Sequence, residues 1–180
     1  MNVKLYAPGQ RDGSPPPIIL DVEASGFDPH SYPIEVGFVT AEGKRYSRLI
    51  RPYPEWTHWC EEAESIHGIS RADLEEFGRD GKEVAQELNQ WLSSETVYTD
   101  GWVLDKPWLI KLFDRAREPM AFWVSPLERV MNEAIMDHWN QAKSELQESF
   151  DEPRHRASTD ALFLQQVFIR ARHLAGRAEG

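Results

Sequence analysis

The segment 18–23, with the sequence IILDVE, constrains this chain more than any other. Its three leading apolar residues predict a strand that is buried on both faces. Because strand side chains two positions apart share one face, the carboxylates of Asp21 and Glu23 project together. Two adjacent carboxylates at the end of a central strand repel each other unless a cation lies between them, so this pair predicts a divalent metal site.

Two further strands are predicted directly after this segment. Residues 24–26 have the composition of a turn, and residues 34–39 alternate apolar and other side chains as in a half-buried strand. Another turn at residues 41–44 leads to residues 46–50, which keep the strand period. The three strands together predict a β-meander.

Apolar spacing in the rest of the chain predicts helices that alternate with two more strands. The predicted helices are 81–92, 107–116, 126–150 and 158–174, and the predicted strands are 95–99 and 121–124. Asp105 stands where an N-terminal cap is expected for the helix that contains Pro107. This order of elements predicts an α/β fold, in which a mixed sheet carries helices on its faces.

The composition fits one domain with a substantial core, because 41% of the 180 residues are apolar. We expect an N-terminal arm at 1–17, a domain at 18–175 and a C-terminal tail at 176–180. The sequence has no long apolar run and no signal peptide pattern, and its single cysteine cannot form an internal disulfide. A cytoplasmic protein without membrane contact is therefore expected.

The net charge of −10 argues against a protein that holds long nucleic acid on a broad basic face. It does not exclude an enzyme that takes short single-stranded ends. In such an enzyme metal ions neutralise the reacting phosphate, and only a few local cations are needed besides. The composition therefore leaves nucleases open.

Residues 21–37 resemble a motif of a known family. They run in the order Asp-x-Glu, a small-residue turn ending in Gly26, the bulky Phe27, Asp-Pro and Ile-Glu-Val-Gly. This order resembles the first motif of the DEDDh 3′→5′ exonucleases, which include polymerase proofreading subunits, RNase T and oligoribonuclease. The resemblance implies an RNase H-like fold, with a mixed five-stranded sheet and helices on both of its faces.

Two later segments resemble the remaining motifs of that family. Asp105, followed by an apolar pair, matches the third acidic residue. The segment is one residue longer than in many members, so Asp100 competes for that role. The sequence HRASTDA places His155 five residues before Asp160, a spacing that marks the histidine subclass. Asp160 is expected in the first turn of the last helix, where the helix N-terminus favours an anion.

The resemblance implies a two-metal hydrolase. Oxygen donors favour Mg²⁺ or Mn²⁺ over zinc, and two ions in such sites lie roughly 3.5–4 Å apart. The implied ligands are Asp21, Glu23, Asp105 and Asp160. His155 is the implied general base, which takes a proton from the attacking water. Single-stranded or short nucleic acid is the expected partner, and nucleoside 5′-monophosphates are the expected products. A homodimer is consistent with the family, whose members often dimerise.

The turn after Asp-x-Glu is implied to hold the 3′ end of the substrate. In the family the backbone here meets the terminal 3′-hydroxyl, and the bulky residue stacks on the last base. By position the implied residues are Ala24, Ser25, Gly26 and Phe27. Core packing is the alternative for Phe27. Glu35, which lies on the next strand, is interpreted as a residue that orders its neighbours rather than as a metal ligand.

Two other functions fit parts of this pattern. One is a non-catalytic nucleic-acid or protein-binding module that keeps the fold, which a metal-dependent nuclease assay distinguishes. The other is an endonuclease or transposase-like enzyme of the same broad fold. Such an enzyme is not expected to carry a histidine five residues before the last aspartate, and a circular substrate tests for it.

Overall fold

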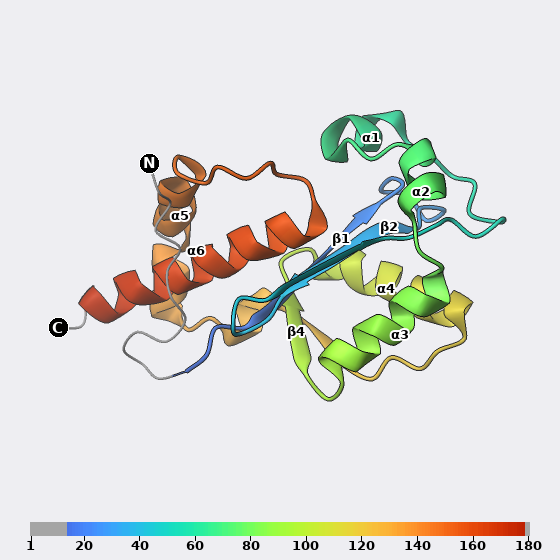
Figure 1. Ribbon diagram of the computed structural model, residues 1–180. Helices are drawn as coiled ribbons and strands as arrows, with labels where there is room; N and C mark the ends of the chain where they lie inside the picture. The colour runs from blue at the N-terminus through green and yellow to red at the C-terminus, as the bar shows by residue number, and fades with distance from the viewer. Residues whose placement is uncertain (1–13, 179–180) are drawn as a thin grey trace.

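The computed structural model describes residues 14–178 of the chain as one mixed five-stranded sheet with helices on both faces (Figure 1). The strands are β1 (Ile18–Ala24), β2 (Pro33–Val39), β3 (Arg45–Leu49), β4 (Thr96–Thr99) and β5 (Trp123–Pro126). The helices are α1 (Glu61–His67), α2 (Arg71–Phe77), α3 (Gly81–Leu92), α4 (Trp102–Ala116), the 3₁₀ turn η1 (Leu127–Val130), α5 (Glu133–Gln147) and α6 (Ala157–Ala178).

The sheet has the strand order β3-β2-β1-β4-β5, with β1 at its centre. The first three strands pair antiparallel as the predicted meander, whereas β4 pairs parallel with both β1 and β5. The α/β class and the mixed direction of the sheet are confirmed. Because parallel strands end at the same edge, the ends of β1 and β4 meet where the acidic segments begin.

Side-chain alternation along β1 separates two cores. Leu20 and Val22 pack in the core that α3 and α4 cover, and Ile19 packs in the core that α5 and α6 cover. This arrangement confirms a strand buried on both faces. It also places Asp21 and Glu23, which alternate with Leu20 and Val22, on the face of α6.

Strand β2 is buried along its whole length, so the predicted half-buried strand is wrong. Its apolar residues Val36 and Phe38 face the first core, as the alternation predicts. The other face is covered because α6 contacts both β1 and β2. The sequence offers no local sign of this coverage, since Glu35 and Gly37 have the residue types of solvent-facing positions.

Helix α4 begins at Trp102, five residues before Pro107, so the prediction that Asp105 is its N-cap is wrong. The carbonyl of Gly101 accepts hydrogen bonds from the N–H groups of Leu104 and Asp105, which closes an additional turn ahead of the proline. Asp105 therefore lies inside the first turn, and its side chain is buried.

The predicted helix 126–150 is interrupted near its start. The 3₁₀ turn η1 comes first, and Asn132 then caps α5 by accepting a hydrogen bond from the N–H of Ile135 at 2.9 Å. Asparagine favours this cap position because its side chain competes with helical backbone bonds. The last helix, α6, continues beyond the predicted end at residue 174 to Ala178.

Helix α6 also anchors the beginning of β1. The side-chain amide of Gln165 donates to the carbonyls of Pro17 and Thr40, each at 2.9 Å. Most of the predicted arm 1–17 and the last two residues of the predicted tail 176–180 lie outside the described residues. Within residues 14–178, no helix is both long and apolar enough to cross a membrane.

Candidate active site

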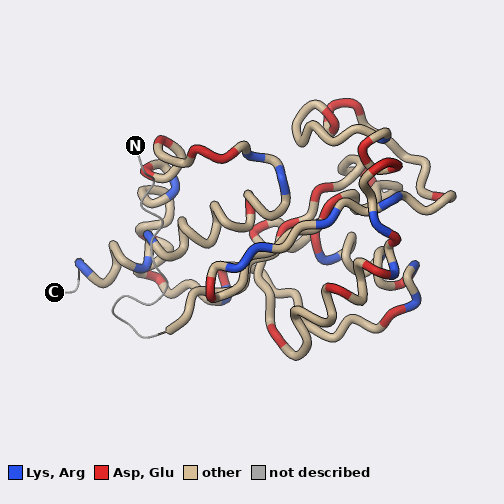
Figure 2. The backbone as a smooth tube through the Cα atoms, viewed as in Figure 1, with Lys and Arg blue, Asp and Glu red and all other residues tan. Residues whose placement is uncertain are grey.

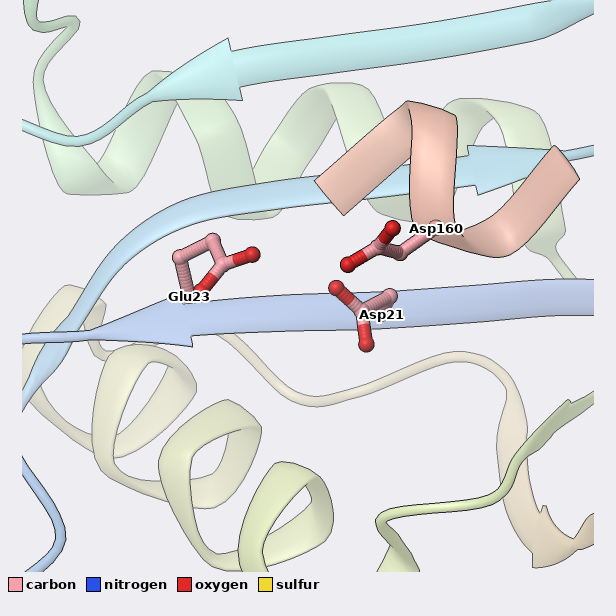
Figure 3. Close-up of side chains that lie close together, drawn as sticks. All are labelled: Asp21, Glu23 and Asp160. Atoms are coloured by element: carbon pink, nitrogen blue, oxygen red, sulfur yellow. The ribbon is translucent and has the colours of Figure 1, made fainter. Parts of the chain in front are cut away.

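Three carboxylates meet between β1 and α6. Asp21 and Glu23 extend from β1, and Asp160 extends toward them from the first turn of α6 (Figure 3). One carboxylate oxygen of each lies within 4.8 Å of the others. The structure thus brings together residues from the first strand and the last helix, and their oxygen-only donor set fits a hard divalent cation such as Mg²⁺ or Mn²⁺.

Glu35 on β2 holds the N-terminus of α6 in this place. Its buried carboxylate accepts hydrogen bonds from the backbone N–H of Ala157 at 3.1 Å, from the Arg156 guanidinium at 2.9 and 3.0 Å and from the Ser47 hydroxyl at 2.7 Å. A carboxylate at a helix N-terminus satisfies an orphan N–H group and interacts favourably with the helix dipole. Glu35 therefore orders its neighbours, as the sequence suggests.

Gly37 permits the close approach of α6 to β2. A Cβ atom built on Gly37 would lie 2.2 Å from the backbone nitrogen of Ser158 and 2.6 Å from the carbonyl carbon of Ala157. Real Cβ contacts are never this short, so any side chain here would push the helix away. The Glu-Val-Gly part of the first motif is thus the docking platform for the segment that carries Asp160.

The carboxylates disfavour their own ionisation. Burial, together with the negative charges of Asp105, Glu23 and Asp160, raises the pKa of Asp21 well above its usual range. Burial and the charges of Asp160 and Glu35 raise the pKa of Glu23 to about 7. Ionisation of these acids places negative charges close together, and a bound cation would neutralise them.

Asp105 lies beside this cluster without joining the set of mutually close oxygens. Its Oδ2 accepts a hydrogen bond from the hydroxyl of Thr99 at the end of β4, and burial raises its pKa to about 7. Among the neighbouring charges, Asp105 raises the pKa of Asp21 most, and Asp100 contributes least. The electrostatics therefore favour Asp105 over the exposed Asp100 as the carboxylate from this segment.

Thr99 was not identified from the sequence as a residue that supports the site. Its hydroxyl contacts both Asp105 and the backbone N–H of Gly101, which lies 3.0 Å away. No local pattern reveals this role, because the contact depends on how α4 packs after β4. Two tryptophans flank Asp105 in the sequence. Trp108 is buried, and the indole N–H of Trp102 donates a hydrogen bond to the carbonyl of Val124.

His155 lies next to Asp160 in the loop that precedes α6. Its backbone N–H donates to Oδ2 of Asp160 at 3.1 Å, and its ring nitrogen Nδ1 lies 4.0 Å from the same oxygen. The side chain is 55% exposed, and the backbone has a positive φ of 64°. Histidine tolerates this left-handed conformation better than most residues do. The imidazole is thus accessible to a substrate at the carboxylates.

Arg154 pairs with the other oxygen of Asp160 through its Nε. Its guanidinium also lies 3.8 Å from the centre of the Phe163 ring, which holds the side chain against α6. From the sequence alone, a solvated arginine and a phosphate contact are equal alternatives at this position. The structure places the charge of Arg154 directly on the carboxylate cluster.

The turn 24–27 contributes to the lining of a cavity of about 160 Å³, which Glu23 and Asp105 also line. Ala24, Gly26 and Phe27 line this cavity, and Phe27 is 67% exposed, so core packing of Phe27 is excluded. A side chain on Gly26 would collide with the ring of His58, which would lie 2.6 Å from the added Cβ atom. This part of the turn is open to a ligand.

Ser25 differs from the other three residues of the turn. It is buried, its N–H donates to the carbonyl of Tyr32 at 2.9 Å, and its carbonyl accepts from Cys60 at 2.8 Å. Its hydroxyl accepts from the N–H of Tyr32 and contacts His58. All of these groups are occupied within the protein, so Ser25 shapes the turn.

A mixed sheet that gathers buried carboxylates beside an accessible histidine is typical of metal-dependent enzymes that act on phosphate esters. The family model described as exonuclease, of the RNase T type, matches residues 18–168. The chain therefore belongs to this exonuclease family of the DEDDh superfamily. A search of curated protein sequences gave no match.

Solved structures of exonuclease I share this fold. The zinc-bound Escherichia coli enzyme in complex with single-stranded DNA superposes with a TM-score of 0.64 at 13% identity, over 86% of this chain and 40% of the other. The enzyme of Methylocaldum szegediense gives a TM-score of 0.57 at 14% identity, over 90% of this chain and 42% of the other. This chain thus spans about two fifths of the length of those relatives.

Proposed function

We propose that this protein is a metal-dependent 3′→5′ exonuclease that hydrolyses single-stranded or short DNA or RNA to nucleoside 5′-monophosphates. The observation that carries the proposal is the convergence of Asp21, Glu23 and Asp160 within 4.8 Å of one another, with His155 beside them. Membership of the exonuclease family and the single-stranded DNA bound in similar structures support the substrate class. We assign this activity to residues 18–175.

Each residue of the site has a distinct part in this proposal. Asp21, Glu23 and Asp160 hold Mg²⁺ or Mn²⁺, with Asp105 beside them for a second ion. Bound divalent ions supply charge neutralisation at the reacting phosphate. His155, in the exposed loop, accepts the proton of the attacking water. These residues all come from one chain, so the proposed reaction needs no residue of a partner subunit.

The 3′-terminal nucleoside occupies the cavity beside the turn 24–27. Glu23 and Asp105 line it, and so does the exposed Phe27, whose aromatic ring is suited to stack on a base. Gly26 leaves the backbone close to the ligand, and Ala24 contributes backbone groups. This placement directs the terminal phosphodiester toward the carboxylates.

The proposal is tested with single-stranded DNA and RNA oligonucleotides of matched sequence in Mg²⁺ and in Mn²⁺. Digestion from the 3′ end of a 5′-labelled strand gives a descending ladder, whereas a 3′-labelled strand releases its labelled mononucleotide at once. Asp21→Ala is expected to abolish both, while Glu76→Ala, at an exposed position of α2, leaves them unchanged. Hydrolysis retained by pure Asp21→Ala protein would overturn the proposal.

A circular single strand separates the rival functions. An exonuclease leaves the circle intact, an endonuclease opens it, and a non-catalytic module cuts neither the circle nor a linear strand. The exposed His155 beside Asp160 favours the exonuclease, because a binding module does not require a general base next to clustered acids.

A further inference from the structure

A second cavity has His155 in its lining. It has a volume of about 420 Å³ and is lined by Lys143, Gln147, Phe150, Arg154, His155 and Phe163. These residues come from α5, from the loop that precedes α6 and from α6 itself. Neither the family pattern in the sequence nor the proposed chemistry assigns a task to this cavity.

The two cavities differ in charge. The one beside the turn 24–27 contains Glu23 and Asp105 and has no Lys or Arg among its described lining residues. The second contains Lys143 and Arg154 in addition to His155. Figure 2 shows basic positions on the loop that leads into α6, in a chain whose net charge is −10. A local gathering of cations on an acidic protein is suited to hold a phosphate.

The carboxylate cluster connects the two cavities. Glu23, which lines the first, is in the cluster with Asp160, and Arg154, which lines the second, is bonded to Asp160. A strand whose terminal nucleoside fills the first cavity has its scissile phosphate at the cluster. The second cavity adjoins the cluster through Arg154 and offers a path for the remainder of the strand.

We propose that Lys143 and Arg154 form a subsite for the phosphate on the 5′ side of the penultimate nucleotide. This inference rests on the proposed function, because it extends the path of the same substrate. The Arg154 guanidinium lies over the Phe163 ring, 3.8 Å from its centre, and Phe150 packs edge-on against that ring with a centroid distance of 5.1 Å. These contacts restrict the side chains that line the cavity, which limits the entropy lost when a phosphate binds.

Lys143 is the better residue for a test, because Arg154 touches a carboxylate of the cluster and Lys143 does not. The ion pairs described for the cluster carboxylate Asp160 are made by Arg154 and His155, so removal of Lys143 leaves these contacts in place. A loss of affinity for a 5′-phosphorylated dinucleotide after this substitution therefore reports on contact with the substrate strand.

The experiment compares two dinucleotides that differ only in a 5′-phosphate, in whichever sugar series the enzyme hydrolyses better. The substrate p-nitrophenyl thymidine 5′-phosphate, which has no nucleotide beyond the scissile bond, serves as a third substrate. We expect the 5′-phosphate to lower KM about five- to tenfold in the unaltered protein, as one charge contact of moderate exposure does. Lys143→Ala and Lys143→Glu remove this advantage and leave the nitrophenyl ester unaffected.

Lys44→Glu, at the exposed turn between β2 and β3, is the control for the change in net charge. A 5′-phosphate advantage that is equal in Lys143→Glu and in the unaltered protein overturns the subsite, provided that hydrolysis itself occurs. Absence of hydrolysis of all three substrates by the unaltered protein overturns the proposed function and the subsite with it. The two failures are thus distinguishable.

Discussion

Glu35 and Arg156 form a bidentate ion pair that joins the middle of β2 to the residue immediately before α6, with N–O distances of 2.9 and 3.0 Å. Glu35 is fully buried in this pair, whereas the Arg156 side chain is 45% exposed. The same carboxylate accepts the N–H of Ala157. Asp160 lies one turn further on, so the position of a proposed metal ligand depends on a residue that contacts neither metal nor substrate.

Replacement of this anchor tests its positioning role. Glu35→Gln keeps the shape of the side chain but lacks the charge, and we expect a loss of about 2 kcal/mol in the free energy of unfolding. We also expect kcat to fall about tenfold or more, because small misplacements of reacting groups are costly. KM for a short oligonucleotide stays the same, since the cavity beside Phe27 is untouched.

The control for Glu35 is Glu42→Gln, at the turn after β2, where neither stability nor kcat should change. Calorimetry of Mn²⁺ binding adds an independent measure, which should weaken in Glu35→Gln. If kcat and metal affinity persist while only the melting temperature falls, Glu35 is merely structural.

Gly37 offers a steric test of the same contact. Gly37→Ala inserts a methyl group 2.2 Å from the Ser158 nitrogen, so we expect destabilisation of about 1–3 kcal/mol as α6 moves away from β2. Gly176→Ala is the matched control within α6, where a Cβ meets no atom within 4 Å. This control should stabilise the helix by up to about 1 kcal/mol. Chemical denaturation measures both, and equal midpoints for the two variants contradict the packing argument.

The sequence was informative where local rules decide the outcome. The period of two along 18–23 correctly placed Asp21 and Glu23 on one face, and the spacing of His155 and Asp160 correctly placed the aspartate in the first helical turn. Local rules failed where a distant element decides. Burial of the polar face of β2 follows from α6, which lies more than 100 residues later in the chain.

The segment around Asp105 shows the same limit. A proline at 107 and an aspartate at 105 predict a cap, since proline favours the first helical turn. The helix nevertheless begins at Trp102, because the Gly101 carbonyl accepts two N–H groups and Thr99 fixes Asp105 from the neighbouring strand. The resemblance to the family motif thus selected a carboxylate that does lie beside the cluster, whereas the local sequence rules misplaced it in the helix.

The pKa values predict how the stability of the metal-free protein depends on pH. The pKa of Glu23 rises from 4.5 to about 7, and that of Asp105 rises from 3.8 to about 7. Between these limits the folded state binds more protons than the unfolded state, so the free energy of unfolding falls as the pH increases from about 4 to about 7. Thermal melts in a chelator are expected to show this decline.

Metal ions should reverse that decline, because they bind the ionised carboxylates and stabilise the folded state. Added Mg²⁺ or Mn²⁺ is therefore expected to raise the melting temperature more at pH 8 than at pH 5. A melting temperature in chelator that rises steadily between pH 5 and pH 8 contradicts the electrostatic argument.

Asp21→Asn should separate stability from activity. Asp21 is surrounded by acidic groups and has a strongly raised pKa, so removal of its charge relieves repulsion in the metal-free protein. We expect a higher melting temperature in chelator at pH 8, a smaller gain on adding metal and no detectable hydrolysis. Asp100→Asn is the comparison, and it should retain metal-induced stabilisation, since the exposed Asp100 is outside the carboxylate cluster. Equal behaviour of the two variants contradicts the assignment of Asp21.

His155→Gly examines the proposed base without straining the loop. Glycine adopts the positive φ of 64° at no steric cost, and it leaves space where the exposed imidazole stood. We expect kcat to fall about 10²- to 10⁴-fold, the usual contribution of a general base. Free imidazole added to the assay should restore part of the rate, and metal-induced stabilisation should persist, because the three clustered carboxylates are unchanged.

The same substitution at His30, which lies in the exposed turn before β2, controls for the loss of a surface histidine. A His155→Gly protein with kcat within twofold of the unaltered protein would exclude His155 as the base.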